Sequence, residues 1–344
     1  MNHELHGAPH LPSPNSVAAT MRQVLYALIP GVLAHLWFFG PGLALQILLA
    51  AFFALGLEAA MLKARGRPLQ PFISDGSALV TAVLFALSIP PLSPWWISLT
   101  GMLFAIVLAK HAYGGLGWNL FNPAMVGVAA VLVAFPEAMS EWLLPRGLSP
   151  HVPGLGESLI AILTGRLPGP EFDAISQATP LDALKIGVAE NRLITEIRND
   201  PIFGDFGGRG WEWIANFYAL GGLWLMYRRV ISWHVPVAVL ATVVIVSTPL
   251  WLFGPDTNPS PLQHIFSGAL VLAAFFIATD PVSGCATLRG RLIFGAGVAI
   301  LTLAIRRLGA YPDGVAFAVL MMNAAAPLID RLTRPRAYGH THGR

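Results

Sequence analysis

The chain has 344 residues, of which 55% are hydrophobic and only 11% are charged. Soluble globular proteins carry about 25% charged residues, so this composition excludes an ordinary soluble domain and indicates a membrane protein. The net charge of +3 is small, and the basic residues lie at the edges of apolar segments, which gives no support for nucleic-acid binding. The single cysteine, Cys285, cannot alone hold an iron–sulfur cluster or a cysteine-based zinc site. Any redox chemistry must therefore come from an organic cofactor.

Apolar segments that cross about 30 Å of hydrocarbon need roughly 17–25 residues each. The predicted spans cover residues 21–39, 42–62, 74–90, 94–110, 121–137, 211–228, 234–253, 262–279, 291–306 and 312–331. These spans predict an all-α polytopic membrane protein with about ten transmembrane helices. The first twenty residues are polar and lack an apolar core, so no cleavable signal peptide is expected.

The distribution of Lys and Arg between the two predicted membrane faces sets the orientation. With the N-terminus inside, thirteen basic residues fall on the inner side, whereas the short outer loops receive only Arg306 and Arg307. The positive-inside rule then favours cytoplasmic termini and a periplasmic long loop. The predicted parts are an N-terminal tail (1–20), a first five-helix bundle (21–137), a periplasmic loop (138–210, hereafter the insert), a second five-helix bundle (211–331) and a C-terminal tail (332–344).

The insert carries nine carboxylates, with a tenth, Glu137, directly before it, and has several Pro and Gly residues and little apolar periodicity. It is expected to form an ordered subdomain without a core of its own, with short helices at about 155–165 and 180–190. Across the two bundles there is a weak echo, because D-G-S-A-L-V at 75–80 is similar to D-G-V-A-F-A at 313–318. The two stretches start on opposite predicted faces, as in a 5+5 inverted repeat, although two Asp-Gly dipeptides can also match by chance.

The segment T-P-L-D at 179–182 is typical of a helix start. Thr179 fits the N-cap, Pro180 the first helical position and Asp182 the third, where an acid approximates a capping box. This structural role accounts for the residues fully. A helix N-terminus also offers free N–H groups and partial positive charge, so a phosphate esterified to the Thr179 hydroxyl would be well placed. Lys185 could add a cation there.

Several motifs spread over the chain in order resemble one family. They are D-A-I-S-Q-A-T at 173–179, S-D-G-S-A-L-V-T at 74–81, I-P-P-L-S-P-W-W at 89–96, G-G-L-G-W-N-L-F-N-P-A-M at 114–125, A-T-D-P-V-S at 278–283 and Y-P-D-G-V-A-F-A-V-L-M-M-N at 311–323. Together they resemble RnfD, a membrane component of the Rnf ion-translocating electron-transport complex. That family is related to NqrB, a component of the Na⁺-translocating NADH:quinone reductase.

The resemblance implies that Thr179 is a covalent FMN site, at which a periplasmic flavin transferase makes a phosphoester. Asp173 and Ser176 occupy matching positions of the attachment motif, whereas Gln177 replaces the usual glycine, whose backbone freedom glutamine lacks.

Family members also hold a non-covalent riboflavin nearer the cytoplasmic side, at two turns. Asn119, Asn122 and Asp280 occupy the matching positions. Asparagine offers the paired donors and acceptors that an isoalloxazine edge needs. The structural alternatives are an ordinary helix start at Asn122-Pro123 and a capped turn at Asp280-Pro281.

The resemblance further implies a component of a bacterial inner-membrane complex that relays electrons between two flavins, coupled to movement of Na⁺ or H⁺. Its expected partners are the other Rnf subunits, including the ferredoxin-like, NADH-binding and second flavin-bearing subunits, and membrane lipid. The protein is part of a redox-driven translocase but should catalyse nothing alone, because it has no nicotinamide-binding fingerprint, cluster ligands or metal site. The alternative is a flavin-free channel or secondary transporter with Asp75, Asp280 and Asp313 near the pore.

Ionisable residues inside the predicted spans are functional candidates by default. Glu58 lies toward the inner end of its span, where it is expected to face water or pair with Lys63. His35 is expected to be a hydrogen-bonded packing residue. Lys110 is expected to snorkel to the membrane surface.

Overall fold

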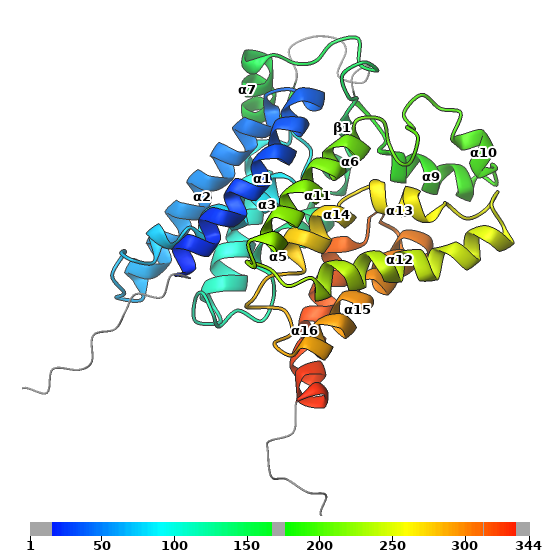
Figure 1. Cartoon of the computed structure of the whole chain (residues 1–344). Helices are drawn as coiled ribbons and strands as arrows, with labels where there is room; N and C mark the ends of the chain where they lie inside the picture. Colours follow the sequence, from blue (N-terminus) through cyan, green and yellow to red (C-terminus); the bar gives the residue numbers. More distant parts are fainter. Residues whose placement is uncertain (1–15, 167–175, 312, 335–344) are drawn as a thin grey trace, which may run out of the picture.

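The computed structural model describes residues 16–166, 176–311 and 313–334, and nearly all of its regular structure is helical (Figure 1). The helices of the first bundle are α1 (Val17–Phe39), α2 (Gly42–Ala64), the 3-10 turn η1 (Ile73–Asp75), α3 (Ser77–Ala86), α4 (Trp95–Met102), the π-helical η2 (Leu103–His111) and α5 (Pro123–Ala134). The helices of the second bundle are α11 (Trp211–Tyr227), α12 (His234–Phe253), α13 (Pro261–Phe266), α14 (Leu270–Leu272), the π-helical η3 (Ala273–Ile277), α15 (Leu288–Leu308) and α16 (Val315–Thr333).

Among the described residues, five helices are long and apolar enough to cross a membrane, namely α1, α2, α12, α15 and α16. The other five predicted spans overlap shorter or interrupted helices: α3, α4 with η2, α5, α11, and the broken run α13–α14–η3. Proline, glycine and π-helical turns interrupt these segments, and a membrane tolerates such irregular backbone only where it is buried in protein or lines a cavity. The helical membrane-protein class is therefore supported, and ten crossings stay a prediction.

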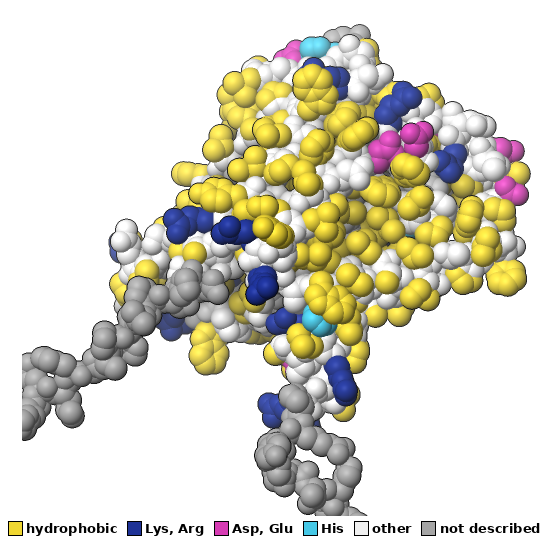
Figure 2. Space-filling view, viewed as in Figure 1, with side chains coloured by type: hydrophobic (Ala, Val, Ile, Leu, Met, Phe, Trp, Pro, Cys, Tyr) yellow, Lys and Arg dark blue, Asp and Glu magenta, His cyan; other side chains and the backbone are white. Residues whose placement is uncertain are grey.

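The first helix begins and the last helix ends on the lower side of Figure 1, whereas most of the insert lies along the upper side. On the face shown in Figure 2, hydrophobic side chains cover the middle of the molecule. Lys and Arg predominate on the lower side, and both signs of charge occur on the upper side. Which of these sides faces the cytoplasm stays a prediction.

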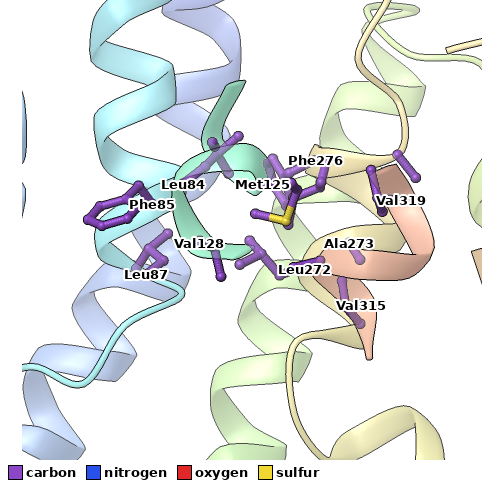
Figure 3. Close-up of a cluster of buried hydrophobic side chains, with 14 of the residues drawn as sticks. Leu84, Phe85, Leu87, Met125, Val128, Leu272, Ala273, Phe276, Val315 and Val319 are labelled. Atoms are coloured by element: carbon purple, nitrogen blue, oxygen red, sulfur yellow. The ribbon is translucent and has the colours of Figure 1, made fainter. Parts of the chain in front are cut away.

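The helices of the two bundles meet in a core that draws on both halves of the chain. In Figure 3, Leu84 from α3, Leu87 directly after α3, Met125 and Val128 from α5, and Phe276 from η3 lie against one another. Leu272 and Val315 complete the contact from α14 and α16. We call these seven side chains the apolar layer. All of them are buried, so the two bundles share one continuous hydrophobic core.

A short helix, α6 (Pro136–Ser140), leads into the insert, which contains β1 (Trp142–Leu143), α7 (Leu155–Thr164), β2 (Ser176–Gln177), α9 (Pro180–Ala189) and α10 (Ile194–Ile197). The helices predicted at 155–165 and 180–190 are confirmed as α7 and α9. The expectation that the insert lacks a core was wrong. Leu184 of α9 packs with Ile194, Ile197, Ile202 and Phe203 in a separate buried cluster. The apolar residues of this cluster come from two short helices and a loop. Segments this short show too little apolar periodicity for the cluster to be predicted from the sequence.

The two stretches of the suspected repeat have similar local structure. In both, an aspartate carboxylate accepts a hydrogen bond from the backbone N–H two residues later, Asp75 from Ser77 (2.7 Å) and Asp313 from Val315 (3.3 Å). Each aspartate thereby begins a helix, α3 or α16. The similarity relates the third predicted span to the tenth, whereas a 5+5 repeat would relate the third span to the eighth. The inverted repeat stays a prediction.

Candidate functional site

Thr179 caps the N-terminus of α9 as the sequence predicts. Its hydroxyl accepts a hydrogen bond from the Asp182 backbone N–H (3.2 Å), and the Asp182 carboxylate accepts from the Thr179 N–H (3.2 Å). The hydroxyl also donates to the Asp182 carboxylate at 2.5 Å. Burial raises the pKa of Asp182 above its ordinary value, against the opposing effect of the hydrogen bonds from Thr179, and the nearby Asp313 raises it further. Thr179 therefore presents an oriented, half-buried hydroxyl beside a carboxylate.

A cavity of about 520 Å³ opens next to this hydroxyl. We call it the Thr179 cavity. Its wall includes the aromatic residues Trp142, Trp211, Tyr218 and Tyr311. The Trp142 and Trp211 rings are 4.9 Å apart in an edge-on arrangement. Because ligand pockets commonly measure about 300–1,000 Å³ and are mostly apolar and aromatic, this volume and lining suit a flat aromatic group.

The other residues predicted around Thr179 have different positions. Ser176 lies in β2, where it pairs with Leu143 of β1. Asp173 lies outside the described residues. The Lys185 ammonium is tied to the loop before α16, because it donates to the carbonyls of Gly309 and Tyr311, the latter at 2.6 Å. Burial lowers the pKa of Lys185, and the charge of Asp182 opposes that shift. Lys185 thus anchors α9 to the second bundle, and its role toward a phosphate stays a prediction.

Asp313 also lines the Thr179 cavity, near Asp182, and is held by a buried arginine. Arg306 was expected in a short outer loop, but it belongs to the last turn of α15 and is only 7% exposed. Its guanidinium donates to the Asp313 carboxylate (3.2 Å) and to the Ser267 carbonyl (2.9 Å). The expectation was wrong because the helix continues to Leu308 and the side chain turns inward to satisfy buried oxygens.

The three residues predicted at the second flavin site line one smaller cavity, of about 110 Å³. We call it the Asn122 cavity. Asn119, Asn122 and Asp280 all contribute to its wall, together with Ser77 and Lys110. Residues that are far apart in the sequence are therefore brought together as expected.

Asn122 is the N-cap of α5, and its side chain is engaged by protein at both ends. Its Oδ1 accepts from the Met125 N–H (3.2 Å), and its Nδ2 contacts the Ile277 carbonyl (3.4 Å). Asn119 donates to the Phe121 carbonyl (3.1 Å), but its buried Oδ1 has no hydrogen-bond partner within the described ranges. An orphaned acceptor in a cavity wall is what a site for a ligand N–H provides.

Asp280 organises the turn that follows η3. Its carboxylate accepts from the Val282 N–H (3.1 Å) and from the Ser283 hydroxyl (2.7 Å). This turn is locked to α16 because Asn323 donates to the Ser283 carbonyl (3.0 Å). Asn323 also accepts from the Asn122 backbone N–H (3.0 Å), so that it joins both turns. Sequence reasoning missed Asn323 as a site residue, although the residue ends the 311–323 motif.

The two cavities are stacked on opposite sides of the apolar layer. Leu84 and Phe276 line the Asn122 cavity, whereas Leu87, Met125 and Leu272 line the Thr179 cavity. Consecutive residues line different cavities, which shows how close the two cavities are. Ala124 lines the Asn122 cavity and Met125 the Thr179 cavity, and Phe276 and Ile277 are divided in the same way. Side chains of the apolar layer, which Figure 3 shows, therefore separate the two cavities.

A buried ion pair lies beside the Asn122 cavity. The Lys110 ammonium donates to the Glu58 carboxylate at 2.5 Å and to the Ser77 hydroxyl at 2.7 Å, and both charged side chains are 2% exposed. The expectations that Lys110 snorkels and that Glu58 faces water or pairs with Lys63 were wrong. The π-helical η2 turns Lys110 inward, toward α2 and α3. π-helical turns occur frequently at functional sites.

The long apolar helices define a helical membrane protein, and two cavities lie within its core. A sequence model of the family described as NQR2, RnfD, RnfE matches residues 4–339. The chain therefore belongs to the NQR2, RnfD, RnfE family.

Relatives include a protein of Escherichia fergusonii that is named as the type-D component of an ion-translocating oxidoreductase complex. It is 46% identical over 345 residues that cover 98% of both chains. Proteins of the same name from Aeromonas hydrophila subsp. hydrophila and Aliivibrio salmonicida are 47% and 48% identical. Those matches cover 96% and 98% of this chain, and 97% and 98% of the relatives. The resemblance read from the motifs is thus confirmed at the level of the family.

Proposed function

We propose that this protein is a membrane subunit of an ion-translocating oxidoreductase complex, and that it relays electrons between two flavins. One flavin is an FMN esterified through its phosphate to Thr179, and the other is a non-covalent riboflavin in the Asn122 cavity. The protein positions these groups and tunes their potentials, since a flavin supplies the redox chemistry itself. The full-length similarity to proteins named as components of such a complex supports the membership.

The observation that carries the FMN proposal is the position of the Thr179 hydroxyl, at a helix N-terminus and on the wall of a cavity of about 520 Å³. The positive end of the α9 helix dipole favours a phosphate at this position. The adjoining aromatic wall offers a place for the ring. A phosphoester at Thr179 Oγ would remove the proton that the hydroxyl donates to Asp182.

The riboflavin proposal is supported by the orphaned Oδ1 of Asn119 and by the position of Asp280 in the same wall. The cavity of about 110 Å³ is smaller than an ordinary ligand pocket, so ring entry requires the turns around Asn119 and Asp280 to move apart. The proposed partners are the other subunits of the complex, with ferredoxin and NAD(H) as the ultimate electron carriers and Na⁺ or H⁺ as the translocated ion. The bacterial inner membrane, a periplasmic insert and a periplasmic flavin transferase belong to this proposal.

The test is in-gel flavin fluorescence of the denatured protein after co-expression with a flavin transferase. The parent band should fluoresce. Thr179→Asn should be dark, because asparagine retains an N-cap acceptor but has no hydroxyl to esterify. Thr179→Ser keeps both features and should fluoresce. Thr195→Ala removes an exposed hydroxyl from the same insert and should leave the band unchanged.

Mass spectrometry of the peptide that contains residue 179 should show the added FMN in the parent. Denaturation of Thr179→Asn should still release riboflavin. A parent band that stays dark in the presence of the transferase would contradict the proposal and favour a flavin-free channel or transporter. Equal fluorescence in parent and Thr179→Asn would place the attachment elsewhere.

A further inference from the structure

Two buried polar side chains in the wall of the Thr179 cavity each carry an atom that has no hydrogen-bond partner among the described residues. His35, on α1, is 2% exposed, and Tyr218, on α11, is 5% exposed. In the described part of the chain, neither His35 Nε2 nor the Tyr218 hydroxyl has a partner. Both residues line the same cavity as Thr179. An unsatisfied buried polar group costs about 1–3 kcal/mol, so two of them in one cavity wall need a physical reason.

Neither side chain is free to turn away from the cavity. The His35 ring packs against Phe39, with centroids 4.9 Å apart, and edge-on against Trp211 at 6.2 Å. The Tyr218 ring contacts Phe276 edge-on at 6.3 Å and lies against the backbone of Gly31, where a side chain would collide with it. Packing therefore fixes both rings, and with them the directions of the two polar atoms.

The expectation that His35 is satisfied by packing hydrogen bonds is thus wrong for its Nε2. The chemistry of the pair indicates what would satisfy it. A tyrosine hydroxyl donates and accepts, and a histidine nitrogen does either, depending on the tautomer. Around them the wall is apolar and aromatic, with Trp142, Trp211 and Leu272. A planar heteroaromatic ring with carbonyl and N–H groups on one edge complements such a wall.

We propose that His35 and Tyr218 hydrogen-bond the polar edge of the flavin ring carried by Thr179, and so position that ring and set its potential. This inference rests on the proposed attachment of FMN to Thr179. A ring held deep between α1 and α11 would lie close to the apolar layer, since Tyr218 contacts Phe276. The two residues would then place the ring at the end of the cavity that faces the second flavin.

The first test uses Tyr218→Phe in the holoprotein. This change removes only an unpartnered hydroxyl and keeps the ring packing, so folding should be unaffected. The covalent fluorescent band should remain at parent intensity. Redox titration of the purified protein should show a shift of about 30 mV in the midpoint potential of the covalent flavin. For a two-electron couple, this shift corresponds to a change of about tenfold in the relative affinity for oxidised and reduced flavin. Tyr227→Phe, on the same helix but 84% exposed, is the matched control and should leave the potential unchanged.

His35→Phe should shift the flavin potential in the same assay. His35→Gln retains a hydrogen-bonding group, so its potential should lie closer to that of the parent. An unchanged potential and absorption spectrum in both Tyr218→Phe and His35→Phe, with the covalent band intact, would overturn the inference and leave FMN attachment standing.

The second test does not depend on covalent attachment. Riboflavin is added to the Thr179→Asn protein, and its binding is followed by fluorescence quenching. Tyr218→Phe in that background should weaken binding about tenfold, because Tyr218 lines only the Thr179 cavity of the two. A dark parent band combined with this Tyr218-dependent binding would contradict FMN attachment and support the ring site. Equal binding with and without the Tyr218 hydroxyl would overturn the ring site.

Discussion

At the scale of single residues, Asp182 joins three features of the molecule. It completes the capping box with Thr179, it lies in the wall of the Thr179 cavity, and it is near Asp313. Burial disfavours the charged form of the Asp182 carboxylate, so Asp182 holds its proton more tightly in the folded than in the unfolded protein.

The raised pKa of Asp182 predicts a pH dependence of stability. Its ordinary value is 3.8, and the folded value lies above it. The folded state therefore binds more protons in the interval between the two values, and the free energy of unfolding decreases as pH rises through that interval. Thermal unfolding of the purified protein should show the parent losing stability, relative to Asp182→Asn, as pH is raised from about 4. Asp205→Asn, which removes an exposed carboxylate of the insert, is the control. A parent that gains stability relative to Asp182→Asn over the same pH range would contradict this prediction.

Because the Glu58–Lys110 pair is buried, removing one of its two charges should strongly lower the stability of the protein. Lys110→Met should destabilise the protein by about 3–5 kcal/mol, because it leaves the Glu58 carboxylate buried without its cation. The double variant Glu58→Gln, Lys110→Met should recover most of the loss. Lys63→Met removes an exposed lysine near Glu58 on the same helix and should change the melting temperature little. A larger loss in Lys63→Met than in Lys110→Met would contradict the pairing.

At the scale of elements, α1 and α11 pack closely enough that backbone meets backbone. A side chain at Gly221 of α11 would collide with the Ala27 carbonyl of α1. Small residues allow this approach, which is common between membrane helices. The contact bears on the proposed ring site because these two helices carry His35 and Tyr218, which line the Thr179 cavity.

Gly221→Ala should therefore destabilise the protein by about 1–3 kcal/mol through overpacking, despite the better helix propensity of alanine. Gly56→Ala on α2 is the matched control, because its added methyl group meets no atom within 4 Å. Thermal unfolding in detergent is the measurement. Equal melting temperatures for Gly221→Ala and Gly56→Ala would show that α1 and α11 can separate without cost.

The sequence was sufficient for features set by neighbouring residues. The cap at Thr179, the helix start at Asn122 and the turn at Asp280 follow from hydrogen-bonding side chains within a few residues of the backbone groups they satisfy. Contacts between distant residues were not predictable in this way. Lys110 meets Glu58 across 52 positions, and Asn122 meets Asn323 across 201. A π-helical turn and helix packing decide these partners, and neither leaves a local pattern in the sequence.

At the scale of the whole molecule, the predicted orientation can be tested because the one native cysteine, Cys285, is only 5% exposed. Thr195→Cys places an exposed thiol in the insert, and Ala112→Cys places one after η2, on the predicted inner side. A membrane-impermeant maleimide added to intact spheroplasts should label Thr195→Cys and spare Ala112→Cys. Inverted vesicles should give the reverse. Labelling of both from the same side would exclude the predicted topology.

The apolar layer treats electrons and cations differently in the electron relay that we propose. Its hydrocarbon side chains form an insulating sheet between the two cavities, thin enough for an electron to tunnel through. A sodium or hydronium ion would have to shed its water to enter the same sheet, at a cost that nothing within Leu84, Met125 or Phe276 can offset. In the proposed relay, electrons and cations therefore follow separate routes through this part of the molecule, and the coupling between them would be mechanical or electrostatic rather than a shared channel.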